Sequence, residues 1–331
     1  PPGTFPPSGV DAGVEPDRIG EVPVSFAPPR LPLSHAGYLV EGESKIEHLT
    51  ATLIGLATSH AIQLRGMSEE ADGERVAVPL DAGRVPDAPS RILYDGLFDG
   101  SRTPVSIDDA GSLQSVRTAL DADAASEARQ QKWFKRLGAG GVASGLGCLT
   151  MVVLGVVFFG GGGLFIGPLM WAVVPVVLSL VITLAVVSAK LKRGQRTAVG
   201  RAWTDQIEGF RTYLSTAEAE QLKFAEGEDL FTKYLPWAVL FGLTERWTQV
   251  CARAVELGRM AEPDTTWYGG GPWSPNIILW NVNGWGDSMS TASVPPPSES
   301  SFGGSGFGGG SGFGGGGFAG GGSGGGGGSG W

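Results

Sequence analysis

Three histidines and one pair of adjacent aspartates are the residues of this chain that an enzyme could most readily use. His35, His48 and His60 lie about a dozen residues apart on segments with helical periodicity, and no Cys or paired carboxylates stand near them at metal-ligand spacing. Asp108 and Asp109 suggest an acid–base pair, but adjacent side chains diverge, so "SIDDAGSL" better fits the start of a helix. We therefore expect no metal, no cofactor and no catalytic residue.

Motifs for nucleotide or acyl-transfer chemistry are also missing from the sequence. It contains no Gly-x-Ser-x-Gly elbow and no Walker loop. The stretch "GAGGVASGLG" is similar to a dinucleotide loop, yet no strand precedes it. Cys148 lies in an apolar stretch and Cys251 in a polar helical one, so we expect no disulfide between them. A net charge of −9 argues against generic nucleic-acid binding.

The segment "WYGGGPWSPNIILWNVNGW" concentrates aromatic residues among turn-forming residues. Such residues line peptide or sugar sites, anchor at a membrane interface, or cover a helical bundle. We favour the third interpretation and keep the other two open. The candidate interaction residues of this segment are Trp267, Tyr268, Trp273, Trp280 and Trp285.

The chain ends in a tail of Gly, Ser and Phe, residues 291–331. Glycine loses more backbone freedom on ordering than any other residue, so the isolated tail is expected to be disordered. Its aromatic residues could bind a partner, copies of the same chain, or a glycine-packed layer, and an inert tail is the alternative. These candidate interaction residues are Phe302, Phe307, Phe313, Phe318 and Trp331.

An uncharged apolar stretch runs from Leu137 to Ala189. Because a bilayer core needs about 20 apolar helical residues, residues 131–193 predict a transmembrane hairpin with spans at about 141–159 and 169–189. A buried hairpin of a soluble protein is the alternative. Basic residues on both flanks predict that both ends of this chain are cytoplasmic, in a multi-pass protein of the bacterial plasma membrane.

Small residues predict how the two spans pack. Gly141 and Gly145 form a small-xxx-small step, which allows packing against the second span or, alternatively, dimerisation. Pro175 is expected to kink the second span because it removes a backbone donor. No ionisable residue lies in either span, so transport of a charged substrate by the hairpin alone is not expected.

The part before the apolar stretch divides into a tether and a small domain. Residues 1–34 carry nine prolines and predict an extended tether. In residues 35–130, a helical pattern changes to alternation at Ile62 and Leu64, and "RVAVPL" alternates likewise, as in a winged helix. Between His35 and Gln130 there are 16 acidic and 8 basic residues, so DNA binding is disfavoured. Protein contact and a purely structural role both remain open.

The part after the apolar stretch predicts a helical domain, residues 194–262, then the Trp-rich segment, residues 263–290. Aromatic and aliphatic residues recur at helical spacing in the first of these, as a small bundle requires. The expected features are a first helix with Trp203, Ile207, Phe210 and Leu214 on one face, a capping box of Ser215 and Glu218, a helix at Leu230–Leu235 interrupted at Pro236, and a helix at Thr244–Leu257.

Several stretches together resemble a bacterial family of predicted membrane proteins, domain of unknown function 2207. They are "AGYLVEG", "LTATLIGLA", "EGFRTYLSTAEAEQL", "LFTKYLPWAVLFGL", "ERW", the "WY" at Trp267 and Tyr268, and the glycine tail. The resemblance covers most of the chain from Leu33 onward. It implies an upstream extracytoplasmic domain and a further membrane helix, and it implies no established catalytic residues.

The expected fold class is a mainly α membrane protein. A two-helix transmembrane hairpin is flanked by a winged-helix-like α+β domain and a helical bundle, with Pro-rich N-terminal and Gly-rich C-terminal segments. The expected function is a membrane scaffold that binds protein partners or its own copies on the cytoplasmic side. The alternative is a component of a cell-envelope enzyme or transporter whose active part lies upstream or in the Trp-rich segment. A membrane-tethered transcription regulator is a third possibility, based only on the winged-helix pattern.

Overall fold

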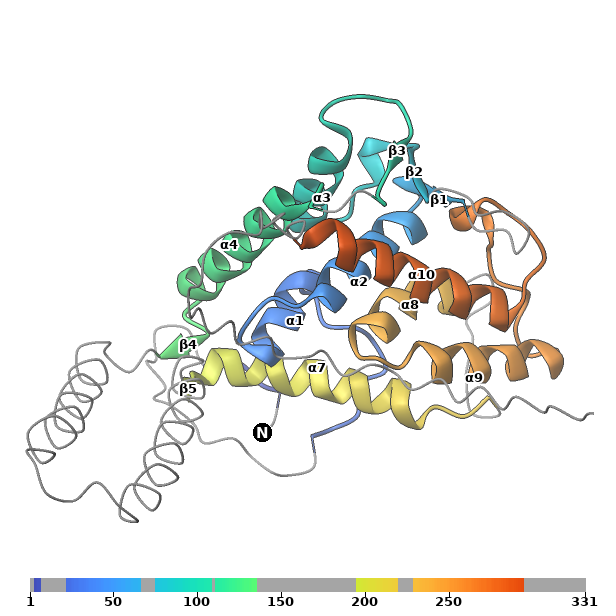
Figure 1. The fold of residues 1–331 in the computed structure, drawn as a ribbon. Coiled ribbons are helices and arrows are strands. Elements are labelled where there is room, and N and C mark those ends of the chain that lie inside the picture. Colours follow the sequence, from blue (N-terminus) through green and yellow to red (C-terminus); the bar gives the residue numbers. More distant parts are fainter. Residues whose placement is uncertain are drawn as a thin grey trace, which may run out of the picture. The chain divides into compact units, whose positions relative to one another are not determined.

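Helix α2, Ile46–Thr58, is the centre of the computed structural model (Figure 1). Every residue from His48 to Ala57 is buried, which is expected of a helix with apolar side chains on all its faces. Four helices pack against it: α1 (Leu33–Glu41), α3 (Ala88–Phe98), α8 (Leu230–Leu240) and α10 (Pro275–Ser293). The core of the protein therefore surrounds α2.

The structure describes residues 3–6, 22–66, 75–108, 111–135, 195–219 and 229–294. All of them belong to one unit, Pro1–Pro296.

A small antiparallel sheet follows α2, with the strand order β1-β2-β3. Ile62 of β1 (Ile62–Arg65) pairs with Pro79 of β2 (Val76–Pro79), and β3 (Val105–Ser106) pairs with the other edge of β2. The hairpin predicted from the alternation at Ile62 and Leu64 is confirmed. A 3₁₀ turn, η1 (Ala82–Arg84), then leads into α3.

Helix α4 (Gln114–Gln130) packs on α1 and α3 and ends near a two-stranded ladder. In this ladder β4 (Phe134–Lys135) pairs with β5 (Gln195–Arg196), and α7 (Ala198–Thr216) begins directly after it. Thr197 caps α7 by accepting the amide hydrogen bond of Gly200 at 3.2 Å.

Three further elements of the described residues follow α8: α9 (Thr244–Glu256), η2 (Thr266–Tyr268) and α10. Helix α9 confirms the prediction at Thr244–Leu257 within one residue. The predicted interruption at Pro236 is wrong, because α8 continues through it to Leu240. The predicted cap at Ser215 is also wrong, because Ser215 lies inside α7 and its hydroxyl donates to the Thr212 carbonyl.

The expected fold class needs correction. In the residues that the structure describes, no helix is long and apolar enough to span a bilayer. The longest of these helices, α7 and α10, have 19 residues each and carry polar or charged side chains along their lengths. The residues of the expected hairpin, 141–159 and 169–189, lie outside the described ranges, as do Gly141, Gly145 and Pro175.

The two flanking domains of the expected fold class are also wrong. Helix α2, expected in a winged-helix-like domain, makes its most extensive contacts with α8, expected in the separate bundle. The sheet is small, and α2 is enclosed by other helices instead of presenting a free face. The described helices before and after the apolar stretch thus form one mainly helical core with a small antiparallel sheet.

Candidate protein-contact surface

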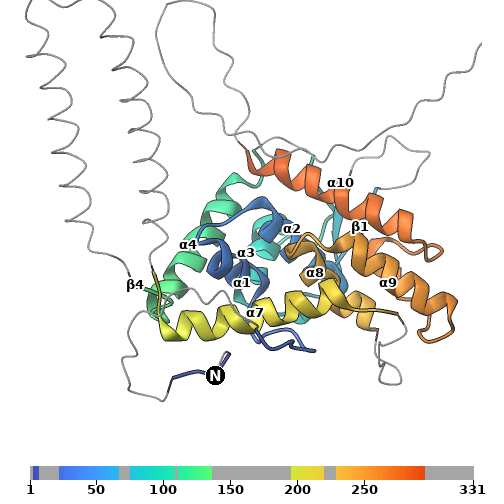
Figure 2. The same cartoon turned by 90° about the horizontal axis from the view of Figure 1, so that it is seen from below.

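An irregular segment, residues 22–32, is here called the strap (Figures 1 and 2). Its first half lies against α7, and its second half lies beside α8 and the end of α2. The Ser25 amide donates a hydrogen bond to the Gly209 carbonyl of α7 at 3.1 Å. The Tyr234 hydroxyl of α8 donates to the Phe26 carbonyl at 3.2 Å. Backbone groups of the strap are thus held by two different helices.

Gly209 is the residue that lets the strap approach α7 so closely. A Cβ atom at this position would collide with the Pro23 carbonyl oxygen and would lie 3.3 Å from the Ser25 nitrogen. Glycine is unfavourable in the middle of a helix by roughly 0.5–1 kcal/mol relative to alanine. In α7 its small size is required because another backbone occupies the space beside it.

A second short piece of the N-terminal region, residues 3–6, also contacts α7. The Gly3 amide donates to Asp205 Oδ2 at 3.0 Å, and Gln206 Nε2 donates to the Gly3 carbonyl at 3.0 Å. The Phe5 ring meets the Trp203 ring edge-on at a centroid distance of 4.8 Å. Both pieces therefore lie on α7.

Large apolar side chains of these pieces remain exposed to solvent. Phe26 is 71% exposed, Phe5 45% and Val24 43%. The Phe26 ring covers Tyr213 edge-on at 5.4 Å. Val24 and Phe26 lie two residues apart on the strap, whereas Phe5 meets Trp203 at a different turn of α7 from Tyr213. Neighbouring exposed apolar side chains are candidates for interaction with another molecule. We call Phe5, Val24 and Phe26 with the α7 residues beneath them the strap surface.

A hollow of about 930 Å³ lies beside the strap, between Val22–Val24 and α7. Its wall contains the ion pair of Arg201 and Asp205, whose Nε and Oδ1 atoms are 3.0 Å apart and whose side chains are both buried. Glu208 adds a further carboxylate to this wall. The wall therefore carries charges of both signs next to the apolar strap.

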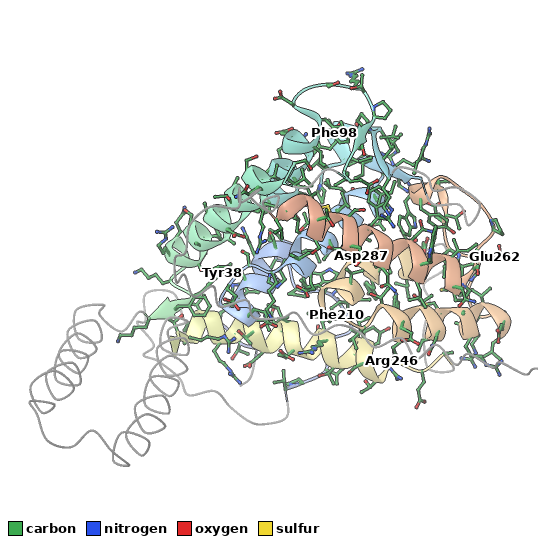
Figure 3. All side chains as sticks on the ribbon, in the orientation of Figure 1. Tyr38, Phe98, Phe210, Arg246, Glu262 and Asp287 are labelled. Carbon is green, nitrogen blue, oxygen red and sulfur yellow. The ribbon has the colours of Figure 1, made fainter. Side chains whose placement is uncertain are left out.

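Aromatic side chains form a layer between the strap and the core. Phe210 of α7, labelled in Figure 3, is fully buried, and its ring centroid lies 5.1 Å from that of Tyr234 and 5.8 Å from that of Trp237. Tyr213 stacks on Phe210 at 6.0 Å. Burial raises the pKa of the Tyr213 phenol to about 12, so this layer is uncharged at neutral pH.

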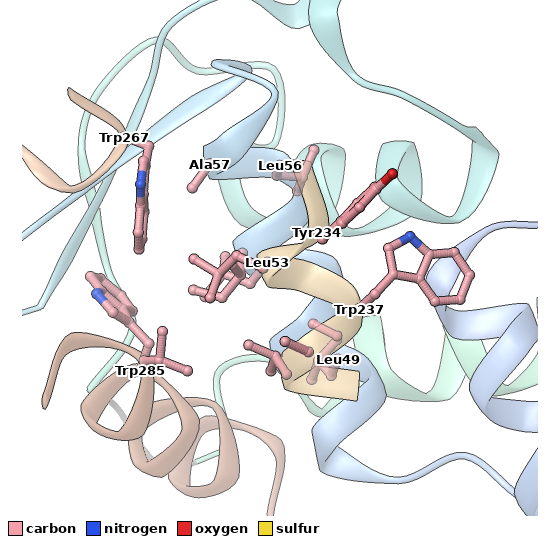
Figure 4. Close-up of a cluster of buried hydrophobic side chains, with 14 of the residues drawn as sticks. Leu49, Leu53, Leu56, Ala57, Tyr234, Trp237, Trp267 and Trp285 are labelled. Atoms are coloured by element: carbon pink, nitrogen blue, oxygen red, sulfur yellow. The ribbon is translucent and has the colours of Figure 1, made fainter. Parts of the chain in front are cut away.

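The Trp-rich segment is divided between core and surface. Trp267 and Trp285 are fully buried and lie on one side of Leu53, while Tyr234 and Trp237 lie on the other (Figure 4). The remaining candidates of this segment are placed as follows: Trp273 packs edge-on against Phe231 at 4.7 Å, Tyr268 is half-buried beside Trp267, and Trp280 is 45% exposed.

The tail candidates lie outside the described residues. They are Phe302, Phe307, Phe313, Phe318 and Trp331.

The three histidines contact different elements. The Nε2 atom of His35 in α1 lies 2.7 Å from Oδ2 of Asp123 in α4, and Nε2 of His60 lies 3.4 Å from Oδ2 of Asp264. His48 accepts the Lys45 amide hydrogen bond at Nδ1, and burial lowers the pKa of its imidazole to about 4. In the described ranges no three His, Cys, Asp or Glu side chains are grouped so that they could hold a metal ion.

Asp108 has a role that the sequence pattern did not indicate. It accepts the Ser288 hydroxyl hydrogen bond at 2.7 Å and the Arg75 amide hydrogen bond at 2.8 Å. Arg75 Nη1 in turn donates to the Ser288 hydroxyl at 3.0 Å. These three residues tie the small sheet to α10, and Asp109 lies outside the described ranges.

Sequence reasoning missed the strap surface because the prolines of residues 1–34 indicated only an extended tether. The available signal was "VPVSF", in which apolar residues alternate within the tether. Such alternation is unusual for a segment that contacts nothing, since linkers are poor in apolar residues.

A family model described as "Predicted membrane protein (DUF2207) C-terminal domain" matches residues 23–250, which is more than half of the chain. The chain belongs to the DUF2207 family. This confirms the resemblance found in the sequence. The DUF2207 match includes most of the strap, α7 and α8, and it ends within α9, before η2 and α10. No curated protein and no solved structure matches the chain.

Proposed function

We propose that this chain is a non-enzymatic contact protein of a membrane assembly and that the strap surface is where it binds a protein partner or a sister subunit. The observation that carries the proposal is the exposure of Val24 and Phe26 on the strap, with Phe5 exposed at another turn of α7. Membership of a family of predicted membrane proteins supports the membrane setting.

The chemistry of the surface suits protein recognition. Aromatic residues are enriched at the energetic centres of protein interfaces, where they bury large areas with few rotatable bonds. Phe26 is already oriented by the Tyr213 ring beneath it, so a partner would order little on binding it. The charged wall that contains Arg201, Asp205 and Glu208 would supply a polar rim beside these apolar groups.

We further propose that the contact is made on the cytoplasmic side of the bacterial plasma membrane. The single cysteine of the described ranges, Cys251, is a buried thiol, which is compatible with a reducing compartment. The net charge of −9 disfavours nucleic acid as the partner.

The alternative role in a cell-envelope enzyme or transporter needs a site among the tryptophans of residues 267–285. Trp267 and Trp285 belong to the core and are closed to a ligand. The proposal of a contact protein therefore has the stronger physical support.

The test is extraction of the full chain from its native membrane in mild detergent, followed by measurement of the particle mass. Phe26→Ser removes the most exposed aromatic ring of the strap surface, and Leu80→Ser is the matched control, since Leu80 is 52% exposed at the end of β2. We expect a multi-chain particle that Phe26→Ser reduces in mass and Leu80→Ser does not. A monomer in all three samples would refute the proposal.

A further inference from the structure

Basic residues of this chain are concentrated on either side of its uncharged stretch. Residues 128–136 and 190–201 together contain nine Lys or Arg residues and no Asp or Glu, whereas the whole chain has 24 basic and 33 acidic residues. In a chain of net charge −9, so local an excess of positive charge indicates an anionic partner.

The β4–β5 ladder brings these two parts of the sequence together. Phe134 pairs with Arg196, and Lys135 pairs with Gln195. The ladder lies at one end of the described unit, where α4 ends and α7 begins (Figure 1). Basic parts that are far apart in the sequence therefore meet at one place in the structure.

The ladder is fixed to the elements around it. Trp133, directly before β4, is fully buried, and its carbonyl accepts the Thr197 amide hydrogen bond at 2.9 Å. The Thr197 hydroxyl donates to the Lys132 carbonyl at 2.7 Å. Arg196 Nη2 donates to the Val40 carbonyl of α1 at 2.7 Å. The backbone that carries the basic residues is thus held by α1 and by the start of α7.

Three cations at this place, Arg129, Lys132 and Lys135, are exposed to solvent, and we call them the basic end. Among the described residues, none of the three forms an ion pair with a carboxylate. Glu127, one turn earlier in α4, accepts a hydrogen bond from Gln131 Nε2 at 3.0 Å. The basic end therefore presents its positive charge to solvent.

The end of helix α4 accounts for only part of this arrangement. Cations near a helix C-terminus are stabilised by the partial negative charge there, which applies to Arg129 and Lys132. The backbone at Lys132 is left-handed, with φ 53°, and turns the chain out of α4 into β4. Lys135 lies beyond this turn, on β4, so the helix end does not explain its charge.

We propose that the basic end is a contact surface for the phosphate groups of anionic phospholipid headgroups. Membership of a family of predicted membrane proteins supports a lipid as the partner. Salt screens charges over about 8–10 Å, so a lipid surface that meets this end responds to its local positive charge more than to the net charge of the chain. The lipid contact is additional to the protein contact proposed above and does not depend on it.

The experiment uses native mass spectrometry to count the lipids bound to the purified full chain in an uncharged detergent. Phosphatidylglycerol and phosphatidylcholine are added at equal concentrations. We expect phosphatidylglycerol to bind in preference to phosphatidylcholine. Because each Lys or Arg near an anionic lipid surface strengthens binding about fivefold, Lys132→Gln/Lys135→Gln should reduce bound phosphatidylglycerol by at least about fivefold and leave phosphatidylcholine unchanged.

Two control variants separate the position of the charge from its amount. Arg65→Gln/Arg102→Gln removes the same charge from exposed positions on β1 and in the loop after α3, and we expect it to bind phosphatidylglycerol as the unmodified chain does. Lys132→Arg/Lys135→Arg keeps the charge and should also bind normally.

Three results would overturn the proposal. The first is equal binding of the two lipids to the unmodified chain. The second is the same loss of phosphatidylglycerol in both glutamine variants, which would show that net charge and not the basic end is responsible. The third is displacement of phosphatidylglycerol by millimolar glycerol 3-phosphate, which would assign the basic end to a free phosphate ester instead of a lipid.

Discussion

The Ser25 amide donates to the Gly209 carbonyl across 3.1 Å and joins the N-terminal strap to the middle of α7. A Cβ atom on residue 209 would collide with the Pro23 carbonyl oxygen. The contact between these two backbones therefore depends on the absence of a side chain at residue 209.

We predict that Gly209→Ala displaces the first half of the strap. The change should accelerate hydrogen–deuterium exchange at the Ser25 amide, because its acceptor moves away. Gly286→Ala in α10 is the matched control, since a Cβ there meets Thr50 at an ordinary 3.9 Å. Replacing a helical glycine by alanine raises the free energy of unfolding by about 0.5–1 kcal/mol. We expect urea unfolding to show this increase for Gly286→Ala and not for Gly209→Ala. Unchanged exchange at Ser25 would contradict the prediction.

We predict that His48 makes the stability depend on pH between pH 6.5 and about pH 4. Burial is the main cause of its lowered pKa, and Glu41 and Glu47 oppose the shift. The unfolded chain therefore takes up the proton first as the pH falls through 6.5. The contribution of neutral His48 to the free energy of unfolding is fully present above pH 6.5. It falls by about 3 kcal/mol in total as the pH decreases to the pKa of His48 in the folded chain.

The variant His48→Gln tests this, because glutamine does not titrate and still offers an acceptor to the Lys45 amide. Chemical unfolding at pH 7, 6, 5 and 4 should show a smaller loss of stability in His48→Gln than in the unmodified chain. Parallel pH profiles for the two proteins would show that another group is responsible.

We predict opposite outcomes for two tryptophans of the same helix. Trp285 is fully buried, so Trp285→Ala should lower the free energy of unfolding by about 3–5 kcal/mol. Trp280 is 45% exposed, so Trp280→Ala should change it by less than about 1 kcal/mol. Urea unfolding of both variants measures the difference. Similar losses for the two would mean that α10 does not pack on α2 through Trp285.

The sequence alone allowed prediction of the local elements that depend on periodicity. The alternation at Ile62 and Leu64 predicted β1, and the helical spacing of Ile207, Phe210 and Leu214 predicted the buried face of α7. Pro236 was misinterpreted because proline removes one amide donor without preventing tertiary packing from continuing a helix. Here the buried residues on both sides of Pro236 hold α8 together.

The sequence could not indicate which elements meet across long stretches of chain. The contact of α2 with α8 and of the strap with Gly209 are long-range relationships that no local pattern records. The same limitation applies to the Trp-rich segment, where identical residue types lie at the core, as Trp285 does, or at the surface, as Trp280 does. Asp108 was likewise interpretable only after Ser288 and Arg75 were seen beside it.

The most direct test of the contact role is photo-crosslinking of the full chain in its native membrane, with a benzophenone amino acid placed at residue 26 or, as a control, at residue 80. Both positions are exposed, on the strap and at the end of β2 respectively. We expect a defined covalent adduct with another protein chain from residue 26 and none of the same mass from residue 80. No adduct from residue 26, or the same adducts from both positions, would contradict it.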